Sequence, residues 1–196
     1  MAKLYFSYSA MNAGKTTILL QASHNYQERG MQTMLLTAAL DDRAGPGKIG
    51  SRIGLSADAH TFDARTDLLA QVLPAHQEKE LACLLVDEAQ FLTPAQVWQL
   101  SVLADDYNLP VMCYGLRTDF QGKLFPGSAE LLAIADVLRE IRTICHCGRK
   151  ASMVIRQSQD GTTVTDGAQI EIGGNDKYVS LCRKHWKEAT GYEHAK

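Results

Sequence analysis

The N-terminal part of the chain contains Ser9-Ala10-Met11-Asn12-Ala13-Gly14-Lys15-Thr16, preceded by an alternating apolar run and followed by a helical pattern. The order strand, glycine-containing loop, Lys-Thr and helix is that of a phosphate-binding P-loop. Backbone N–H groups of such a loop and of the helix N-terminus form a concave site for anions. We therefore expect Lys15 to contact the β- and γ-phosphates of a nucleotide and Thr16 to bind Mg²⁺. The alternative is a chance Gly-Lys-Thr at the start of a helix.

Ser9 stands where most P-loops have their first glycine. Glycine permits a tight, left-handed backbone at that position, and a serine held at positive φ would cost about 1 kcal/mol. The backbone conformation of Ser9 is therefore a question that only the folded chain answers.

Length and composition favour one α/β domain with a small appendage. The chain has 196 residues and a net charge of −2, which argues against a disordered tail and against general affinity for nucleic acid. No apolar run approaches the ~20 residues of a membrane span, and a strand begins so early that no signal peptide is expected. The five cysteines are an odd number and favour a reducing compartment. We therefore expect a cytoplasmic protein without a membrane partner.

Three continuous apolar runs predict buried strands of a parallel sheet. They are Thr33–Ala38, Leu81–Val86 and Pro110–Gly115, and a helix between two such strands implies a right-handed crossover. The second run ends in Asp87-Glu88, where the aspartate can hold Mg²⁺ and the glutamate can face the reacting group. Ligands of open α/β sheets bind at the carboxyl ends of the strands, so the P-loop and Asp87-Glu88 are expected to meet there.

Two loops and one helix carry further expectations. Residues 41–52 are rich in glycine and charge and predict a long surface loop, either functional or simply solvated. The loop from Leu116 to Gly127 contains two phenylalanines, which either line a pocket for a planar ligand or hold the loop against the core. The helix that begins at Asp67 is expected to break or end at Pro74.

The last quarter of the chain contains two pairs of metal-binding residues, Cys145/Cys147 and Cys182/His185, about 35 residues apart. A Cys₃His set around a hairpin-like segment is the layout of a zinc ribbon, in which Zn²⁺ stabilises a unit too small to bury its own core. His146 is an alternative ligand, although consecutive side chains diverge and thiolates are preferred for structural Zn²⁺. Four protein ligands leave no open position, which predicts a structural site.

Five segments, in order along almost the whole chain, carry a more specific pattern. They are Ser9–Thr16, Asp87–Phe91, Tyr114–Phe120, Ile144–Ala151 and Gly173–Tyr178. Together they resemble the thymidine kinases of the cytosolic, zinc-containing type II class in its bacterial form. The resemblance implies transfer of the γ-phosphate of ATP to the 5′-OH of thymidine, for DNA synthesis. It also implies a RecA-like P-loop domain at residues 1–142, a zinc-binding lasso domain at 143–190 and a tail at 191–196.

The resemblance also implies a role for individual residues. Glu88 would be the general base, with Lys15 and Arg43 assisting, and Thr16 and Asp87 would lie next to Mg²⁺. The residues implied for ATP are Ser9, Ala10, Met11, Asn12, Ala13, Gly14, Lys15, Thr16, Asp87, Glu88, Ala89 and Gln90. Those implied for thymidine are Met11, Phe91, Leu116, Phe120, Phe125, Gln169, Ile170, Glu171, Ile172, Gly173 and Tyr178. The implied zinc ligands are Cys145, Cys147, Cys182 and His185. A homotetramer and feedback inhibition by dTTP are implied as well.

Two other functions are compatible with a P-loop. One is an ATPase that acts on nucleic acid through the zinc ribbon, against which the near-neutral charge and the lack of a basic stripe argue. The other is a regulatory nucleotide-binding protein without turnover. The aromatic loop separates these functions from the kinase, because a hydrolase needs no aromatic nucleoside pocket.

Overall fold

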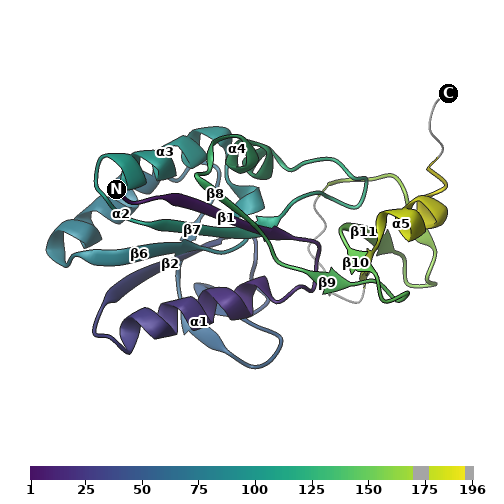
Figure 1. Ribbon diagram of the computed structural model, residues 1–196, viewed down its shortest axis with the longest axis horizontal. Coiled ribbons are helices and arrows are strands. Elements are labelled where there is room, and N and C mark those ends of the chain that lie inside the picture. The colour runs from purple at the N-terminus through teal and green to yellow at the C-terminus, as the bar shows by residue number, and fades with distance from the viewer. Residues whose placement is uncertain (170–176, 193–196) are drawn as a thin grey trace.

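A computed structural model describes residues 1–169 and 177–192 of the chain. Its centre is a six-stranded sheet in the order β5-β2-β6-β7-β1-β8 (Figure 1). The strands are β1 (Leu4–Ser9), β2 (Gln32–Ala38), β5 (His60–Phe62), β6 (Leu81–Val86), β7 (Val111–Leu116) and β8 (Val137–Glu140). Every neighbouring pair in this sheet is parallel. The predicted α/β fold with a central parallel sheet is therefore confirmed.

Helices cover both faces of the sheet. On one face lies α1 (Lys15–Gln27), and on the other lie α2 (Leu68–Glu78), α3 (Pro94–Asp105) and α4 (Pro126–Ile134) (Figure 1). Two hydrophobic clusters fill the layers between, one containing Leu19 and Leu20 of α1 and the other containing Leu100 of α3 and Leu131 of α4. The inner strands β2, β6 and β7 are largely buried on both faces, which explains their continuous apolar sequences.

The helix expected to stop at Pro74 continues through it to Glu78, so that prediction was wrong. Proline removes one backbone donor and normally breaks a helix interior. Here Leu73 and Ala75 on either side of the proline pack against the main core cluster. This tertiary packing outweighs the local preference of proline. Helix α3 begins at Pro94, and Thr93 and Gln96 form a reciprocal capping box at its start.

The sequence predicted a long surface loop for residues 41–52, but part of this segment forms a strand. Lys48–Gly50 forms strand β3, which pairs antiparallel with β4 (Ser56–Asp58). Ile49 is 2% exposed and packs in the same cluster as α1, and this anchors the hairpin. Strands of three residues are too short to show a period in the sequence.

The C-terminal segment lies at one end of the molecule (Figure 1). Strands β9 (Thr143–Ile144) and β10 (Lys150–Ala151) form an antiparallel pair, and β12 (Thr163–Val164), β11 (Met153–Gln157) and β13 (Tyr178–Leu181) form an antiparallel sheet in that order. Helix α5 (Arg183–Thr190) follows. The small core of the C-terminal segment contains Ile155, Leu181 and Trp186 together with Cys145 and Cys182.

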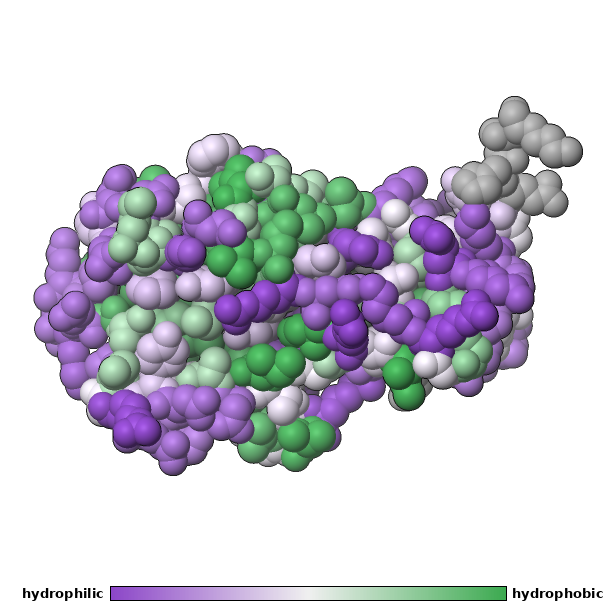
Figure 2. All heavy atoms as spheres, in the orientation of Figure 1, coloured by the Kyte–Doolittle hydropathy of each residue, from purple (hydrophilic) through white to green (hydrophobic). Residues whose placement is uncertain are grey.

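None of the described helices combines the length and the apolar character that crossing a bilayer requires. Apolar side chains gather over α3 and α4 on the face shown in Figure 2. Two of the exposed large apolar residues are Trp98 of α3 and Leu138 of the edge strand β8, at 54% and 46% exposure.

Candidate active site

The loop between β1 and α1 has the backbone of an anion site. Asn12 and Gly14 have left-handed conformations, with φ of 62° and 81°. Gly14 is the N-cap of α1 and, having no side chain, leaves the first N–H groups of the helix open to a ligand. Ser9 is the last residue of β1, in register with Leu116, and it is not among the residues with positive φ. The serine at this position therefore carries none of the strain considered from the sequence.

Lys15 folds back over the loop. Its side chain is buried, and its Nζ donates to Ser9 Oγ at 3.2 Å and to the Ala10 carbonyl at 3.5 Å. Burial lowers the pKa of Lys15, and the carboxylates of Glu88 and Asp87 partly offset this effect. A cation held in this way, with weak neutral partners, is well placed to turn to a phosphate.

Thr16 and Asp87 come together from different elements. The Thr16 hydroxyl donates to Asp87 Oδ2 at 2.9 Å, although the residues are 71 positions apart in the sequence. Burial, followed by the neighbouring Glu88 carboxylate, raises the pKa of Asp87 to about 7. A buried carboxylate beside a hydroxyl offers the oxygen ligands that hard divalent cations prefer, and a bound cation would offset the cost of burying this charge.

Asp87 should make the ligand-free protein less stable as pH rises. Its pKa is higher in the folded than in the unfolded chain, so between about pH 4 and pH 7 the folded state binds more protons and the free energy of unfolding falls with pH. Replacing Asp87 with asparagine should therefore stabilise the protein more at pH 8 than at pH 5. Urea unfolding in EDTA measures this, with the exposed Asp105→Asn as control. Equal differences at the two pH values would contradict the prediction.

Glu88 has an unusual backbone and a fully engaged carboxylate. Its φ and ψ are 52° and 37°, a left-handed conformation that costs a non-glycine residue about 1–2 kcal/mol. Such strain is concentrated at functional sites. Its Oε1 accepts from Arg43 Nη2 at 2.6 Å, and its Oε2 accepts from Gln90 Nε2 at 2.5 Å. Arg43 also pairs with Asp41, so the three charged groups form one chain of contacts.

One cavity of about 650 Å³ joins these groups to the aromatic loop. Predicted site residues that line it are Met11, Asn12, Ala13, Gly14, Lys15, Thr16, Arg43, Glu88, Gln90, Phe91, Leu116, Phe120, Phe125, Gln169 and Tyr178. Phe91 and Phe125 meet edge to face, with ring centroids 5.9 Å apart. Ser9, Ala10, Asp87 and Ala89 lie outside the lining, and all four are buried. Residues 170–173 lie outside the described part of the chain.

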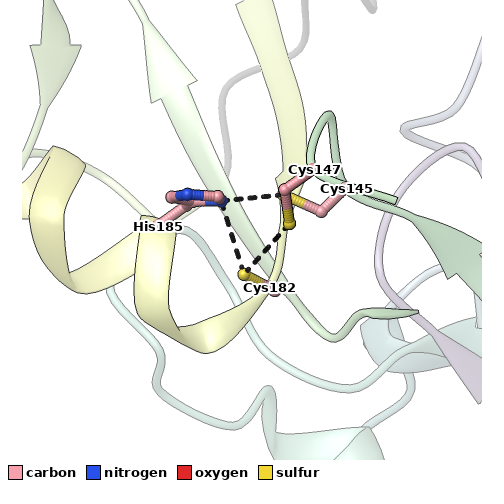
Figure 3. Close-up of side chains that lie close together, drawn as sticks. All are labelled: Cys145, Cys147, Cys182 and His185. Atoms are coloured by element: carbon pink, nitrogen blue, oxygen red, sulfur yellow. Dashed lines mark hydrogen bonds between the residues drawn. The ribbon is translucent and has the colours of Figure 1, made fainter. Parts of the chain in front are cut away.

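A second cluster lies away from the cavity, in the C-terminal segment. Cys145, Cys147, Cys182 and His185 bring their ligand atoms within 4.8 Å of one another (Figure 3). His146 is not in this group, and its ring stacks on His185 with centroids 4.2 Å apart. Burial opposes ionisation of Cys145, but hydrogen bonds from the backbone of Cys147 and Cys182 and from His185 lower its pKa to about 6. The thiolate is the form that binds metal, so the cluster can hold a metal ion.

A family model described as thymidine kinase matches residues 2–186 of the chain. The chain belongs to the thymidine kinase family. It is 68% identical to the thymidine kinase of Agrobacterium fabrum, covering 96% of this chain and 97% of that protein. It is 65% identical to the thymidine kinase of Ruegeria pomeroyi, covering 100% and 99%. The thymidine kinase of Vibrio cholerae is 59% identical, covering 97% and 100%.

Several residues that line the cavity of this thymidine kinase family member were not predicted from the sequence. They are Val154 of β11, Asp119 and residues 50–53, which begin in the β3–β4 hairpin. Only the glycine- and charge-rich composition of residues 41–52 pointed to the hairpin. No local signal distinguished Val154 from the other apolar residues of its strand.

The C-terminal segment of this family member is tied to the P-loop by hydrogen bonds. The Ser180 hydroxyl of β13 donates to the Met11 carbonyl at 2.6 Å, and the Arg117 guanidinium donates to the Ser152 carbonyl at 3.0 Å. The part of the cavity wall formed by Val154 of β11 and Tyr178 of β13 is therefore tied to the β1–α1 loop.

Proposed function

We propose that this protein phosphorylates thymidine, transferring the γ-phosphate of ATP to the 5′-OH to give ADP and dTMP. One observation carries the proposal: a single cavity has a phosphate-binding loop at one end and an aromatic wall at the other. A hydrolase requires only the first of these ends. The relatives described above, which match 96–100% of the chain, are named thymidine kinases.

Glu88 acts as the general base that takes the proton of the 5′-OH. It lines the cavity next to Lys15, within reach of a hydroxyl aimed at a phosphate on the P-loop. Lys15 and the loop N–H groups hold the phosphates, and Arg43 adds positive charge.

Thr16 and Asp87 are the residues that would hold Mg²⁺. Their hydrogen-bonded oxygens and the raised pKa of Asp87 fit a divalent cation better than an isolated carboxylate would. The ion, when bound with ATP, neutralises the charge that develops on the phosphates. The chain contributes the position of these two oxygens at the carboxyl edge of the sheet.

The thymidine pocket comprises Met11, Phe91, Leu116, Phe120, Phe125, Gln169 and Tyr178, with the segment Ile170–Gly173 supplying backbone groups to the edge of the base. Planar aromatic walls suit a nucleobase. Hydrogen bonds to the N3–H and carbonyl edge of thymine would discriminate against cytosine, because a mismatched edge leaves buried polar groups unpaired.

Residues 143–190 form a zinc-bearing lasso unit that closes over the nucleoside. The ligand set Cys145, Cys147, Cys182 and His185 has the composition of a closed structural zinc site.

The further proposals are a homotetramer, feedback inhibition by dTTP and a cytoplasmic location. Exposed apolar residues such as Trp98 and Leu138 fit burial between subunits, and dTTP joins a thymidine to the phosphates that the P-loop binds.

Thymidine should stimulate ADP release strongly, and dTMP should appear in equal amount. The assay compares ADP formation by the purified protein with ATP and Mg²⁺ alone, with thymidine, with deoxycytidine and with single-stranded DNA. We expect stimulation by thymidine only. Equal stimulation by DNA would favour the nucleic-acid-dependent ATPase, and no stimulation by thymidine would exclude the kinase.

A further inference from the structure

The aromatic wall of the cavity is supported from behind by a buried arginine. Phe120 is 2% exposed and lines the cavity. The guanidinium of Arg156 lies 4.1 Å from the centroid of its ring, and Arg156 itself is 5% exposed. A cation over an aromatic ring is attracted most strongly where water is excluded, so this contact constrains the plane of the ring.

Strand β11 supplies this arginine and part of the cavity lining from the same face. Side chains two residues apart in a strand point the same way, and Val154, two residues before Arg156, lines the cavity. The strand therefore presents Val154 to the cavity and Arg156 to the ring of Phe120.

The same guanidinium also holds the backbone of residues 166–168, which leads to the cavity-lining residue Gln169. Its Nη1 donates to the Ala168 carbonyl at 3.0 Å and its Nη2 to the Asp166 carbonyl at 3.4 Å. A side chain on Gly167 between them would come within 2.6 Å of Nη2, so the backbone wraps closely around the guanidinium. The next residue, Gln169, lines the cavity and donates to Asp119 Oδ2 at 2.8 Å.

We propose that Arg156 is a positioning residue for the nucleoside: it fixes the Phe120 ring and the 166–168 backbone relative to each other. This inference rests on the proposed thymidine kinase activity. Arg156 does not line the cavity, so it acts through Phe120 and through the segment ending at Gln169. The Phe120 ring and the 166–168 backbone, which it contacts, belong to the aromatic end of the cavity. Its loss should therefore weaken thymidine binding and leave ATP binding unchanged.

The test compares Arg156→Met, Arg156→Lys and Gln157→Met with the unmodified full-length protein. Methionine keeps an unbranched stem but removes the charge and both donors, whereas lysine keeps the charge without the planar fork that reaches two carbonyls. Gln157 is the next residue of β11, points to the opposite face and bonds the Gly161 carbonyl, so it is a matched control. The measurements are KM for thymidine, KM for ATP, kcat and bound zinc.

We expect the KM for thymidine to rise about tenfold or more in Arg156→Met and by an intermediate factor in Arg156→Lys. The KM for ATP should stay within about twofold, zinc should remain at one equivalent, and Gln157→Met should match the unmodified protein. Equal increases in both KM values, or an unchanged KM for thymidine, would overturn the proposal. If Arg156→Met does not fold, Arg156→Lys decides, and an unchanged thymidine KM in that variant overturns the proposal. If the proposed kinase activity is itself wrong, the unmodified protein will show no thymidine-dependent ADP release. That outcome differs from every outcome that concerns Arg156 alone.

Discussion

Glu88→Gln is expected to lower kcat by on the order of 10²–10⁴-fold and to leave ATP binding nearly unchanged. Glutamine has nearly the same shape, and it cannot accept the proton of the 5′-OH. The loop proposed to bind ATP lies between β1 and α1 and includes Lys15, and the substitution changes no residue of it. Steady-state turnover with saturating thymidine measures the first effect, and calorimetric titration with ATP measures the second.

The contacts of Glu88 make this a sharper test than the sequence alone allowed. Both of its oxygens accept hydrogen bonds, from Arg43 and from Gln90. Glutamine keeps one carbonyl acceptor, so the strained backbone turn at this position should persist and the variant should fold. Glu28→Gln, on the exposed end of α1, is a suitable control and should keep full activity. A Glu88→Gln protein with unchanged kcat would remove the general-base role.

Cys182→Ser is expected to release the metal ion and to raise the KM for thymidine about tenfold or more. The link between the two sites is Trp186, which follows His185 on α5. Its Nε1 donates to the Phe120 carbonyl at 3.1 Å and to the Val154 carbonyl at 3.0 Å, so α5 holds two residues that line the cavity. Small metal-bound units fold around their ion. Loss of the Cys182 thiolate should therefore loosen α5 and the hydrogen bonds from Trp186 to the Phe120 and Val154 carbonyls.

Zinc content by mass spectrometry, thermal unfolding and thymidine kinetics measure the effects of Cys182→Ser. The matched control is Cys83→Ser, a buried thiol in β6 that belongs to the sheet core and not to the metal cluster. That control should lose some stability, because it places a hydroxyl in the core, but it should keep one equivalent of zinc and an unchanged KM for thymidine. Zinc retained at one equivalent after Cys182→Ser would argue against Cys182 as a ligand.

The sequence was most informative where structure is locally encoded. The P-loop and the apolar strand that ends in Asp87-Glu88 were predicted because short-range patterns specify them. The Cys₃His set was predicted because metal ligands come in closely spaced pairs. Where a packed environment competes with local preference, as at Pro74 in α2, the prediction was wrong.

The sequence by itself determined the main strands of the parallel sheet and the helices between them, the P-loop motif and the types of residue available for chemistry. Only the tertiary structure decided that Thr16 meets Asp87, that Arg43 pairs with Glu88 and that Arg156 lies behind Phe120. The reason is physical. Periodicity and spacing report which face of an element is buried, but a contact between side chains many residues apart depends on how the elements pack. Ser9 illustrates both sides, because its position in the motif was readable from the sequence and its unstrained backbone was not.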